Sequence, residues 1–435
     1  MTRAADKITS LQIEALAYGG SGLGYHEGKV VFVPMTAPGD RVSCVVYKNK
    51  KRFAKARLER VLEPSPDRCA APCPVFGECG GCQWQHLPYD LQSDWKQRIF
   101  SDLLRRQSDI PDNRIRPLIA APSPWHYRSR AQLKMRVIDG RLVMGFYRRG
   151  SHYIIDHRQC AILHPRLGEV AAIFRDALNG SSHAAKIPQM DLGVGDDEAV
   201  RILLHYLGED RDQLAAFLQP VALAAQVALF LQTGDRGQLH RVCGAEDLLI
   251  EVGDPPLQLA YGPGGFAQIN LAQNRKLVSI VVETVRRLGA RQVLDLFCGM
   301  GNLTLPVARE VVSVTGVEDF PQSIDKARFN ACNQGTGRAD FYCAQAEEAL
   351  ARLSREQVFD LVILDPPRTG AYDVIKQLQR LKPRHILYVS CEPPTLARDL
   401  VPLLRNGYAL DWSQPLDFFP QTHHIESVTL LRRTG

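Results

Sequence analysis

Two short apolar runs in the C-terminal half of the chain each end in residues that can do chemistry. Residues 359–364 lead into Asp365-Pro366-Pro367-Arg368, and residues 385–389 lead into Ser390-Cys391. Runs of this length predict buried strands, and proline cannot continue a strand but suits the first turn of a helix. Open α/β sheets bind their ligands at the carboxyl ends of the strands. Asp365 and Cys391 are therefore predicted to form two walls of one pocket.

A third strand end predicts a nucleoside site. Residues 292–306 have the pattern of a strand, a glycine turn and a helix, and the following strand, residues 311–318, ends in Glu318. An acidic residue at that position can bind both ribose hydroxyls. The glycine turn lacks the third glycine and the Lys-Ser/Thr pair of phosphate-binding loops. A nucleoside without phosphates therefore fits better than a nucleotide, and S-adenosylmethionine is the common one.

Cysteines are clustered in the first third of the chain. Residues 69–82 hold four of the eleven cysteines, and Cys73, Cys79 and Cys82 have C-x5-C-x2-C spacing. A zinc ion would need a fourth Cys or His, which Cys69 could supply. Iron–sulfur clusters can take a ligand from a distant segment, and Cys160 is the best candidate for that. The spacing alone leaves zinc and an iron–sulfur cluster open.

Positive charge is concentrated in two stretches. Residues 1–63 hold eleven Lys and Arg against six Asp and Glu, which gives a net charge of +5 within a chain total of +6. Six of these cations lie in residues 48–57, where they suit either an exposed edge strand or a face that contacts phosphates. Residues 126–158 add eight Lys and Arg against two Asp, interleaved with aromatic side chains. We expect both stretches to face RNA.

Hydrophobic periodicity predicts the elements that must position these residues. In the first half of the chain it indicates short strands at 8–17 and 30–33, a glycine turn at 19–24, a helix at 87–108, and strands at 128–138 and 141–147. A helix at 270–288 is followed by alternating strands and helices, a pattern that predicts a parallel, doubly wound sheet. Three domains follow from this division: 1–63, 64–262 and 263–435.

Composition limits the class of protein. The chain has 435 residues, of which 45% are hydrophobic, so it can build several cores. No apolar run is long enough to cross a membrane, and the N-terminus lacks the apolar core of a signal peptide. Eleven cysteines without an export signal argue against a disulfide framework. We expect a cytoplasmic monomer that binds neither membranes nor DNA.

Five motifs together resemble the RNA uracil-5-methyltransferase family, and most closely its members that act on 23S ribosomal RNA. They are FxQxN, LDLFCGxGN, DPPR, SC and FPxTxHxE, at residues 266–270, 294–302, 365–368, 390–391 and 419–426. The resemblance covers essentially the whole chain. It implies an OB-like TRAM barrel at 1–63, a central α+β domain with a 4Fe-4S cluster at 64–262, and a Rossmann-like α/β methyltransferase domain at 263–435.

The same resemblance implies roles for individual residues. Cys391 corresponds to the nucleophile and Glu426 to the base. The expected contacts with S-adenosylmethionine are Gln268, Phe297, Asn302, Glu318, Gln345 and Asp365. The expected cluster ligands are Cys73, Cys79, Cys82 and Cys160. One position departs from the family pattern, because Glu392 replaces the asparagine that usually follows the nucleophile. A carboxylate pointing toward Cys391 would disfavour the thiolate, so we expect Glu392 to point away.

The chemistry of uracil is consistent with these roles. Carbon 5 of uracil is a weak nucleophile, and addition of a thiolate at carbon 6 makes it a strong one. After methyl transfer a base must remove the proton from carbon 5. Without its motif, Glu426 would more simply be a surface carboxylate at the start of a C-terminal strand. Asp365 and Arg368 are placed to hold the edge of a base that has left its stack.

Two other functions would account for part of these features. A transfer RNA uracil-5-methyltransferase shares the catalytic motifs, but we expect its shorter chain to lack the TRAM domain and the cysteine cluster. A non-catalytic RNA-binding or iron–sulfur redox protein would not need the pair Cys391 and Glu426. The sequence therefore favours a methyltransferase that uses S-adenosylmethionine to convert a uridine of 23S rRNA to 5-methyluridine.

Overall fold

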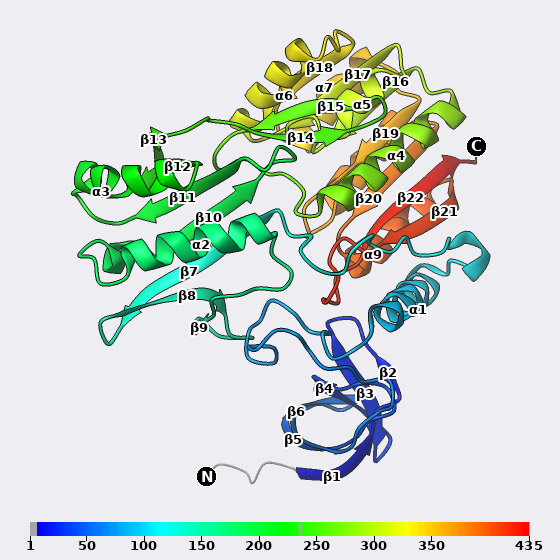
Figure 1. Cartoon of the computed structure of the whole chain (residues 1–435). Helices are drawn as coiled ribbons and strands as arrows, with labels where there is room; N and C mark the ends of the chain where they lie inside the picture. Colours follow the sequence, from blue (N-terminus) through cyan, green and yellow to red (C-terminus); the bar gives the residue numbers. More distant parts are fainter. Residues whose placement is uncertain (1–6, 235–236, 435) are drawn as a thin grey trace.

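Three sheets organise the chain in the computed structural model, which describes residues 7–234 and 237–434 (Figure 1). In Figure 1 the N-terminal sheet lies below the C-terminal sheet, with α1 at the right, while the central sheet extends to the left. The structure does not describe residues 1–6, 235–236 and 435. These residues belong, in that order, to the domains predicted at 1–63, 64–262 and 263–435.

The N-terminal sheet has the order β1-β5-β6-β4-β3-β2, in which only the β4–β6 pairing is parallel. Its strands are β1 (Lys7–Gln12), β2 (Ala15–Leu16), β3 (Ser21–His26), β4 (Lys29–Pro34), β5 (Arg41–Asn49) and β6 (Phe53–Glu63). The glycine-dense stretch 19–24 is only partly a turn, so that prediction was wrong for its second half. Gly22 and Gly24 belong to β3, where a Cβ would lie 2.1 Å from the Thr36 hydroxyl and the Gln12 carbonyl respectively.

The basic stretch 48–57 forms a hairpin tip between β5 and β6. Both strands are interior to the sheet order, whose edges are β1 and β2. The interpretation of this stretch as an edge strand was therefore wrong. All six cations of the stretch are exposed, while Ala54 and Ala56 alternate with them into the core. Strand alternation thus directs Lys55 and Arg57 to the solvent side of β6.

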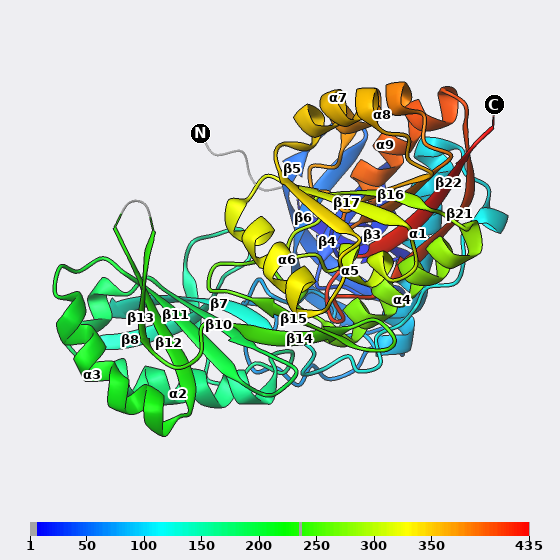
Figure 2. The ribbon, with the colours of Figure 1, turned by 90° about the horizontal axis from the view of Figure 1, so that it is seen from above.

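The central sheet has the order β13-β12-β11-β10-β7-β8-β9. Its strands are β7 (Arg130–Ile138), β8 (Arg141–Tyr147), β9 (Ile154–Asp156), β10 (Gln189–Val194), β11 (Val200–Tyr206), β12 (Val227–Thr233) and β13 (Gln238–Cys243). Two helices, α2 (Pro165–Leu178) and α3 (Arg211–Ala224), pack on one face of it (Figure 2). The predicted pair of basic strands agrees with β7 and β8, in which Ala131, Leu133 and Met135 are buried between cationic neighbours.

The C-terminal sheet has the order β18-β17-β16-β19-β20-β22-β21. Its strands are β16 (Gln292–Leu296), β17 (Ser313–Glu318), β18 (Ala339–Cys343), β19 (Leu361–Leu364), β20 (His385–Ser390), β21 (Tyr408–Leu416) and β22 (Glu426–Arg433). Pairing is parallel from β18 to β20, whereas β22 runs antiparallel to β20. The predicted doubly wound sheet is confirmed, and its order reverses between β16 and β19, which is where such sheets bind ligands.

Helices cover both faces of this sheet (Figure 2). One face packs against α4 (Leu271–Leu288), α5 (Thr304–Ala308) and α6 (Pro321–Asn333). The other packs against α7 (Ala346–Glu356), α8 (Tyr372–Leu381) and α9 (Pro393–Arg405). Because β19 and β20 are buried on both faces, their sequences are continuously apolar. The hairpin β14 (Leu248–Val252) and β15 (Leu257–Tyr261) packs beside α4 and α6, and short 3-10 turns lie at Asp112–Arg114 and Ala184–Lys186.

The helix predicted at 87–108 is α1 (Tyr89–Ser108), and it packs on α9 of the C-terminal sheet. Its Lys96 is fully buried and donates to Asp417, 2.7 Å away, and to the carbonyl of Phe419. Asp417 follows β21 and is also fully buried. This ion pair therefore joins α1 to the irregular segment between β21 and β22, 321 residues further along the chain.

We predict that Lys96→Met lowers the free energy of unfolding by about 3–5 kcal/mol, because it leaves the Asp417 carboxylate buried without its cation. Chemical denaturation followed by circular dichroism measures this change. Arg106→Met is the matched control, since Arg106 lies on the same helix but its side chain is 76% exposed. Equal losses of unfolding free energy in the two variants would contradict the importance of the buried ion pair. The double variant Lys96→Met/Asp417→Asn should recover part of the stability that Lys96→Met loses.

Candidate functional site

The register of β20 and β22 brings Cys391 and Glu426 together. Ser390 pairs with Ser427 in this antiparallel ladder, so the next pair outward is Cys391 opposite Glu426. Directly opposed residues of antiparallel strands have Cβ atoms about 4.5–5.5 Å apart. Asp365 follows β19, the neighbour of β20, at the same edge of the sheet. Asp365 and Cys391, which were predicted to lie at two separate strand ends, therefore share one edge of the sheet with Glu426, the predicted base.

Cys391 lies in a site that disfavours its thiolate in the free protein. Burial, followed by the negative charges of Glu426 and Asp365, raises the pKa of Cys391 to about 12, and the Arg368 guanidinium acts in the opposite direction. Glu392 is absent from the charges that act most strongly on this thiol. Its carboxylate instead faces the Tyr18 hydroxyl, whose pKa burial and Glu392 both raise. The expectation that Glu392 points away from the thiol stays a prediction.

The carboxyl groups at this edge are also held toward their neutral forms. Glu426 is 3% exposed, and burial, with the charge of Asp365, raises its pKa well above the ordinary value. Burial and the charge of Glu318 raise the pKa of Asp365 to about 7. Arg368 is exposed and opposes the shift of Glu426. A ligand with positive charge would favour the ionised forms of all these groups.

The predicted nucleoside contacts lie around the ends of β16 and β17. Glu318 accepts hydrogen bonds from the backbone amides of Gly299 and Phe320 at 3.1 Å each, which orients its carboxylate. Phe297 has a positive φ of 67°, a strained conformation of a kind that concentrates at binding sites. Asn302 exchanges two hydrogen bonds with Asn274 of α4, at 2.8 and 2.9 Å.

Two further predicted contacts lie on neighbouring loops. Gln268 is partly buried in the loop before α4, and that loop ends at Asn270, whose side chain caps the helix by accepting from the Gln273 amide at 3.2 Å. Gln345 is exposed just before α7, next to the end of β18. The structure therefore arranges all six predicted contacts along the carboxyl edge or the loops beside it.

Asp295 was not singled out from the sequence, although it lies inside the LDLFCG motif. It is fully buried at the end of β16, where one carboxylate oxygen accepts from the Thr304 hydroxyl at 2.5 Å and the other has no protein partner. Burial raises its pKa to about 7. A buried aspartate with an unused oxygen beside Glu318 and Asp365 is an acceptor that a ligand can use.

The loop 417–425, which precedes Glu426, is held by segments from the first hundred residues. Gln92 of α1 donates to the Gln421 side chain at 2.9 Å and accepts from the Gln421 amide at 2.9 Å. The Gln421 carbonyl accepts from the amides of Gln83 and Trp84. His423 contacts the Gln83 side chain at 3.2 Å and the edge of the Tyr18 ring. The position of Glu426, the predicted base, therefore depends on the N-terminal third of the chain.

The four cysteines predicted as cluster ligands line one cavity. Cys73, Cys79, Cys82 and Cys160 surround it, together with Arg128. Cys69, the alternative fourth ligand, is exposed and lies outside this lining. Burial raises the pKa of Cys82 to about 12, and it also raises the pKa values of Cys79 and Cys160. Within the described ranges, no three Cys, His, Asp or Glu side chains converge on a single metal ion.

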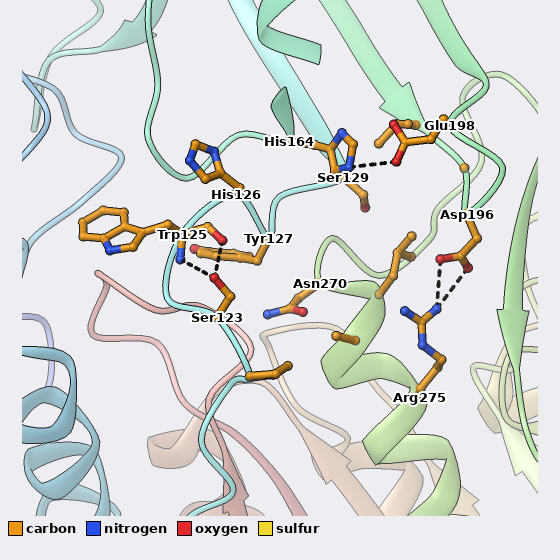
Figure 3. A pocket seen from close by; sticks show the side chains of 15 residues that line it. Ser123, Trp125, His126, Tyr127, Ser129, His164, Asp196, Glu198, Asn270 and Arg275 are labelled. Carbon is orange, nitrogen blue, oxygen red and sulfur yellow. Dashed lines mark hydrogen bonds and ion pairs between the residues drawn. The ribbon is translucent and has the colours of Figure 1, made fainter. Parts of the chain in front are cut away.

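A second cavity, of about 220 Å³, lies between the central and C-terminal sheets (Figure 3). Trp125 and Tyr127 line one side of it, and Asn270 and Arg275 of the α4 region line the other (Figure 3). It does not include Cys391 or Glu426. Within its lining, Arg275 forms an ion pair with Asp196, and the His164 ring lies 3.5 Å from a carboxylate oxygen of Glu198. Every helix that the structure describes is too short or too polar to span a lipid bilayer.

Two family models match the chain. Residues 113–434 match tRNA (Uracil-5-)-methyltransferase, and residues 7–58 match the TRAM domain. Similar curated proteins include 23S rRNA (uracil(1939)-C(5))-methyltransferases from Shewanella amazonensis and Aromatoleum aromaticum. Each is 36% identical to this chain; the alignments cover 97% of this chain in both cases, and 95% and 99% of the relatives.

A similar solved structure is that of the Pyrococcus abyssi tRNA (uracil-54, C5)-methyltransferase in complex with S-adenosyl-L-homocysteine. It has a TM-score of 0.76 and 25% identity, and the match covers 97% of this chain and 99% of that one. The expectation that a tRNA enzyme of this kind would be shorter and lack the N-terminal domain was therefore wrong. Overall architecture does not separate the two RNA substrates.

We predict that Asp295 makes the folded protein less stable as the pH rises from about 4 to 7. Its folded pKa of about 7 exceeds the ordinary aspartate value, so the folded state holds a proton that the unfolded state has lost. The free energy of unfolding of Asp295→Asn, relative to wild type, should therefore rise by about 2–4 kcal/mol across this window and stay level above it. Thermal denaturation of the ligand-free protein at a series of pH values measures this. Asp340→Asn, at an exposed aspartate of β18, is the control, and parallel profiles for wild type and Asp295→Asn would contradict the prediction.

Proposed function

The chain belongs to the RNA uracil-5-methyltransferase family, and from this premise we propose its reaction. It transfers a methyl group from S-adenosylmethionine to carbon 5 of a uridine in 23S rRNA, in the cytoplasm, and the product is 5-methyluridine. The uridine is the one equivalent to position 1939 in the names of the bacterial relatives. The observation that carries the proposal is the opposed pair of Cys391 and Glu426 at the carboxyl edge of the sheet.

The side chains of the edge fit S-adenosylmethionine. Glu318 is oriented by two backbone amides with lone pairs left for the ribose hydroxyls, and the unused oxygen of Asp295 points to a further polar contact. We assign the binding of the cofactor to the six residues Gln268, Phe297, Asn302, Glu318, Gln345 and Asp365. When bound, S-adenosylmethionine supplies the methyl group on a sulfonium whose positive charge favours the ionised forms of nearby carboxyl groups and thiols.

Cys391 acts first on the substrate. Its thiolate adds to carbon 6 of the flipped uracil and forms a carbon–sulfur bond, and the electron pair of the 5,6 double bond moves into an enolate that makes carbon 5 nucleophilic. Arg368 is the cation beside Cys391 and Glu426, so it favours the thiolate and, with Asp365, is placed to hold the edge of the base. A flipped base loses the stacking contacts that it makes in the RNA, and contacts with the protein must replace them. Phe266, which is 66% exposed, lies on the adjoining loop.

Glu426 acts after the methyl group has reached carbon 5. Its carboxylate takes the remaining proton from carbon 5, the double bond re-forms, and the sulfur of Cys391 leaves carbon 6 with the electron pair of the carbon–sulfur bond. Its buried position excludes water from the proton transfer and keeps its pKa high in the free protein. A base with a raised pKa is better matched to proton removal near neutral pH than an ordinary carboxylate.

We further propose that Cys73, Cys79, Cys82 and Cys160 hold a 4Fe-4S cluster. The fit rests on the donor set, since four thiols line one cavity, and on local donors of hydrogen bonds, since the Gly81 amide lies 3.4 Å from the Cys79 sulfur. Arg128 in the cavity wall partly offsets the negative charge of thiolates. The cluster lies apart from Cys391, so its role is structural.

RNA binding is assigned to the two basic surfaces. The exposed cations of the hairpin tip at 48–57 belong to the TRAM domain, and β7 adds Arg136 on its exposed side. Lys and Arg at such positions bind the phosphate backbone without reading sequence. These surfaces therefore supply affinity, while the choice of uridine depends on contacts near Cys391.

Transfer of labelled methyl to in vitro transcripts tests the substrate. We expect methylation of a 23S rRNA fragment that contains the equivalent of position 1939, and none of that fragment after its target uridine is replaced by cytidine. A tRNA transcript is the second substrate. If the tRNA is methylated and the rRNA fragment is not, the chain carries out the tRNA reaction instead. That reaction is the principal alternative because of the similar Pyrococcus abyssi enzyme.

Variants of the two catalytic residues should fail at different steps. Cys391→Ala should form no covalent complex with RNA and no product. Glu426→Gln should still form the complex and add the methyl group, but release should slow by roughly 100- to 10,000-fold because the base is gone. A denaturing gel with labelled RNA and labelled methyl donor detects the complex as a shifted, doubly labelled band. Release of 5-methyluridine by Glu426→Gln at the wild-type rate would exclude Glu426 as the base.

The metal content distinguishes a cluster from zinc. We predict about four iron and four sulfide per chain in protein purified without oxygen, with a brown colour. Elemental analysis and the visible absorption spectrum measure both. Cys160→Ala should lose the iron, whereas Cys69→Ala should retain it, because Cys69 lies outside the cavity. One zinc per chain with no iron would contradict the proposal.

A further inference from the structure

A short segment, residues 126–130, connects the cysteine cavity to the loop 266–270. We call it the bridging segment. Arg128 forms a parallel bridge with Leu163, just after Cys160, and an antiparallel bridge with Asn270. It is therefore paired on one side with the chain that carries a proposed cluster ligand and on the other with the chain that carries Gln268.

The bonds to the cluster side are backbone hydrogen bonds. The His126 amide donates to the Ala161 carbonyl at 3.0 Å, and the Arg128 amide donates to the Ile162 carbonyl at 2.9 Å. The Arg128 carbonyl in turn accepts from the His164 amide at 3.0 Å. These bonds involve three of the four residues that follow Cys160, so the backbone just after Cys160 is tied to the bridging segment.

The bonds to the loop 266–270 come from the next two residues. The Ser129 amide donates to the Ile269 carbonyl at 2.8 Å, and its buried hydroxyl donates to the same carbonyl at 3.1 Å. The Arg130 guanidinium donates to the Ala267 carbonyl at 3.0 Å and lies 5.8 Å from the Phe266 ring. Figure 3 shows Ser129 on this segment, close to Asn270 at the start of α4.

The loop 266–270 has little regular structure of its own. It contains no helix or strand before Asn270, and Phe266 is exposed. Irregular backbone of this kind is ordered by the partners of its carbonyl and amide groups. The bridging segment supplies four such bonds, since the Ser129 hydroxyl also lies 3.5 Å from the Gln268 carbonyl. Tyr127 adds a bond from its hydroxyl to the Pro420 carbonyl at 3.0 Å, in the loop before Glu426.

Arg128 also connects the bridging segment to the cavity through its side chain. Its guanidinium lines the cavity, lies 5.5 Å from the Phe146 ring and donates to the Arg130 carbonyl at 2.9 Å. A cation held against four thiolates has its position set by their charge. The same side chain thus contacts the cavity and the residue that holds Ala267.

We propose that Arg128 and Ser129 are positioning residues through which the occupied cysteine cavity orders the loop 266–270 for binding of RNA and cofactor. The proposal rests on the proposed function, because that function assigns the ligands of the loop and the cluster of the cavity. It gives the cluster a definite task, which is to fix a binding loop from a distance and take no part in electron transfer.

Hydrogen–deuterium exchange of the full chain tests the connection without any methylation. Peptides that cover 125–130 and 263–271 are compared between iron-loaded protein and protein from which iron has been removed by oxidation and chelation. Loss of iron should raise exchange in both peptides by about fivefold or more, while α8 stays unchanged as an internal control. Unchanged exchange at 263–271, with or without a change at 125–130, would overturn the proposal.

Ser129→Ala tests it in protein that keeps its iron and all backbone bonds. Loss of the hydrogen bonds from this hydroxyl to the Gln268 and Ile269 carbonyls should raise the KM for RNA about 2- to 10-fold with kcat nearly unchanged, because uniform binding is weakened. Ser123→Ala is the matched control, since the exposed Ser123 bonds only within its own turn. A fall in kcat at constant KM, or the same KM in both variants, would overturn the role of Ser129. Absence of methylation by the wild type would refute the proposed function instead, and the exchange comparison would still decide this inference.

Discussion

The buried ion pair between Lys96 and Asp417 is the constraint on which the candidate site most depends. The loop that follows Asp417 has no regular structure until β22 begins at Glu426, so its polar backbone needs partners from elsewhere. Lys96, Gln92 and the amides of residues 83–84 provide them. The N-terminal third of the chain therefore positions the loop before Glu426, the proposed base, although Glu426 itself belongs to the C-terminal sheet. This dependence explains why a methyltransferase sheet alone would not make the same site.

The second constraint is electrostatic. Asp295, Glu318, Asp365 and Glu426 crowd one edge of the sheet, and burial raises the pKa of each. Arg368 is the nearby cation that acts on Cys391 and Glu426. A site of this kind is poorly suited to an anionic ligand but well suited to a sulfonium, whose charge compensates the carboxylates as they ionise. A sulfonium at this edge would also favour the thiolate of Cys391, because the negative charges of Glu426 and Asp365 are among the causes that raise its pKa.

Much of the fold and of the candidate site could be predicted from the sequence, because apolar runs and prolines mark where buried strands end. That was enough to place Asp365 and Cys391 at one edge and to find the basic β7 and β8. The register that puts Glu426 opposite Cys391 could not be predicted, since it depends on pairing between strands that are separated in the sequence by α9 and β21. The glycines of β3 were misjudged because their cause is close packing against Thr36 and Gln12. Contacts between distant segments, such as Tyr18 with Glu392, leave no local pattern at all.

Covalent attachment of Cys391 to the target uridine is the central claim, and mass spectrometry of a trapped complex tests it most directly. A 23S rRNA fragment with 5-fluorouridine at the target position is incubated with the protein and S-adenosylmethionine. In 5-fluorouridine, carbon 5 carries fluorine in place of the proton that the base removes. Release of Cys391 is therefore blocked, and the complex should persist after methyl transfer. After digestion, the peptide that contains Cys391 should carry one methylated fluorouridine nucleotide. Attachment at another cysteine, such as Cys298 just after β16, or no attachment in protein that methylates ordinary rRNA, would contradict the account.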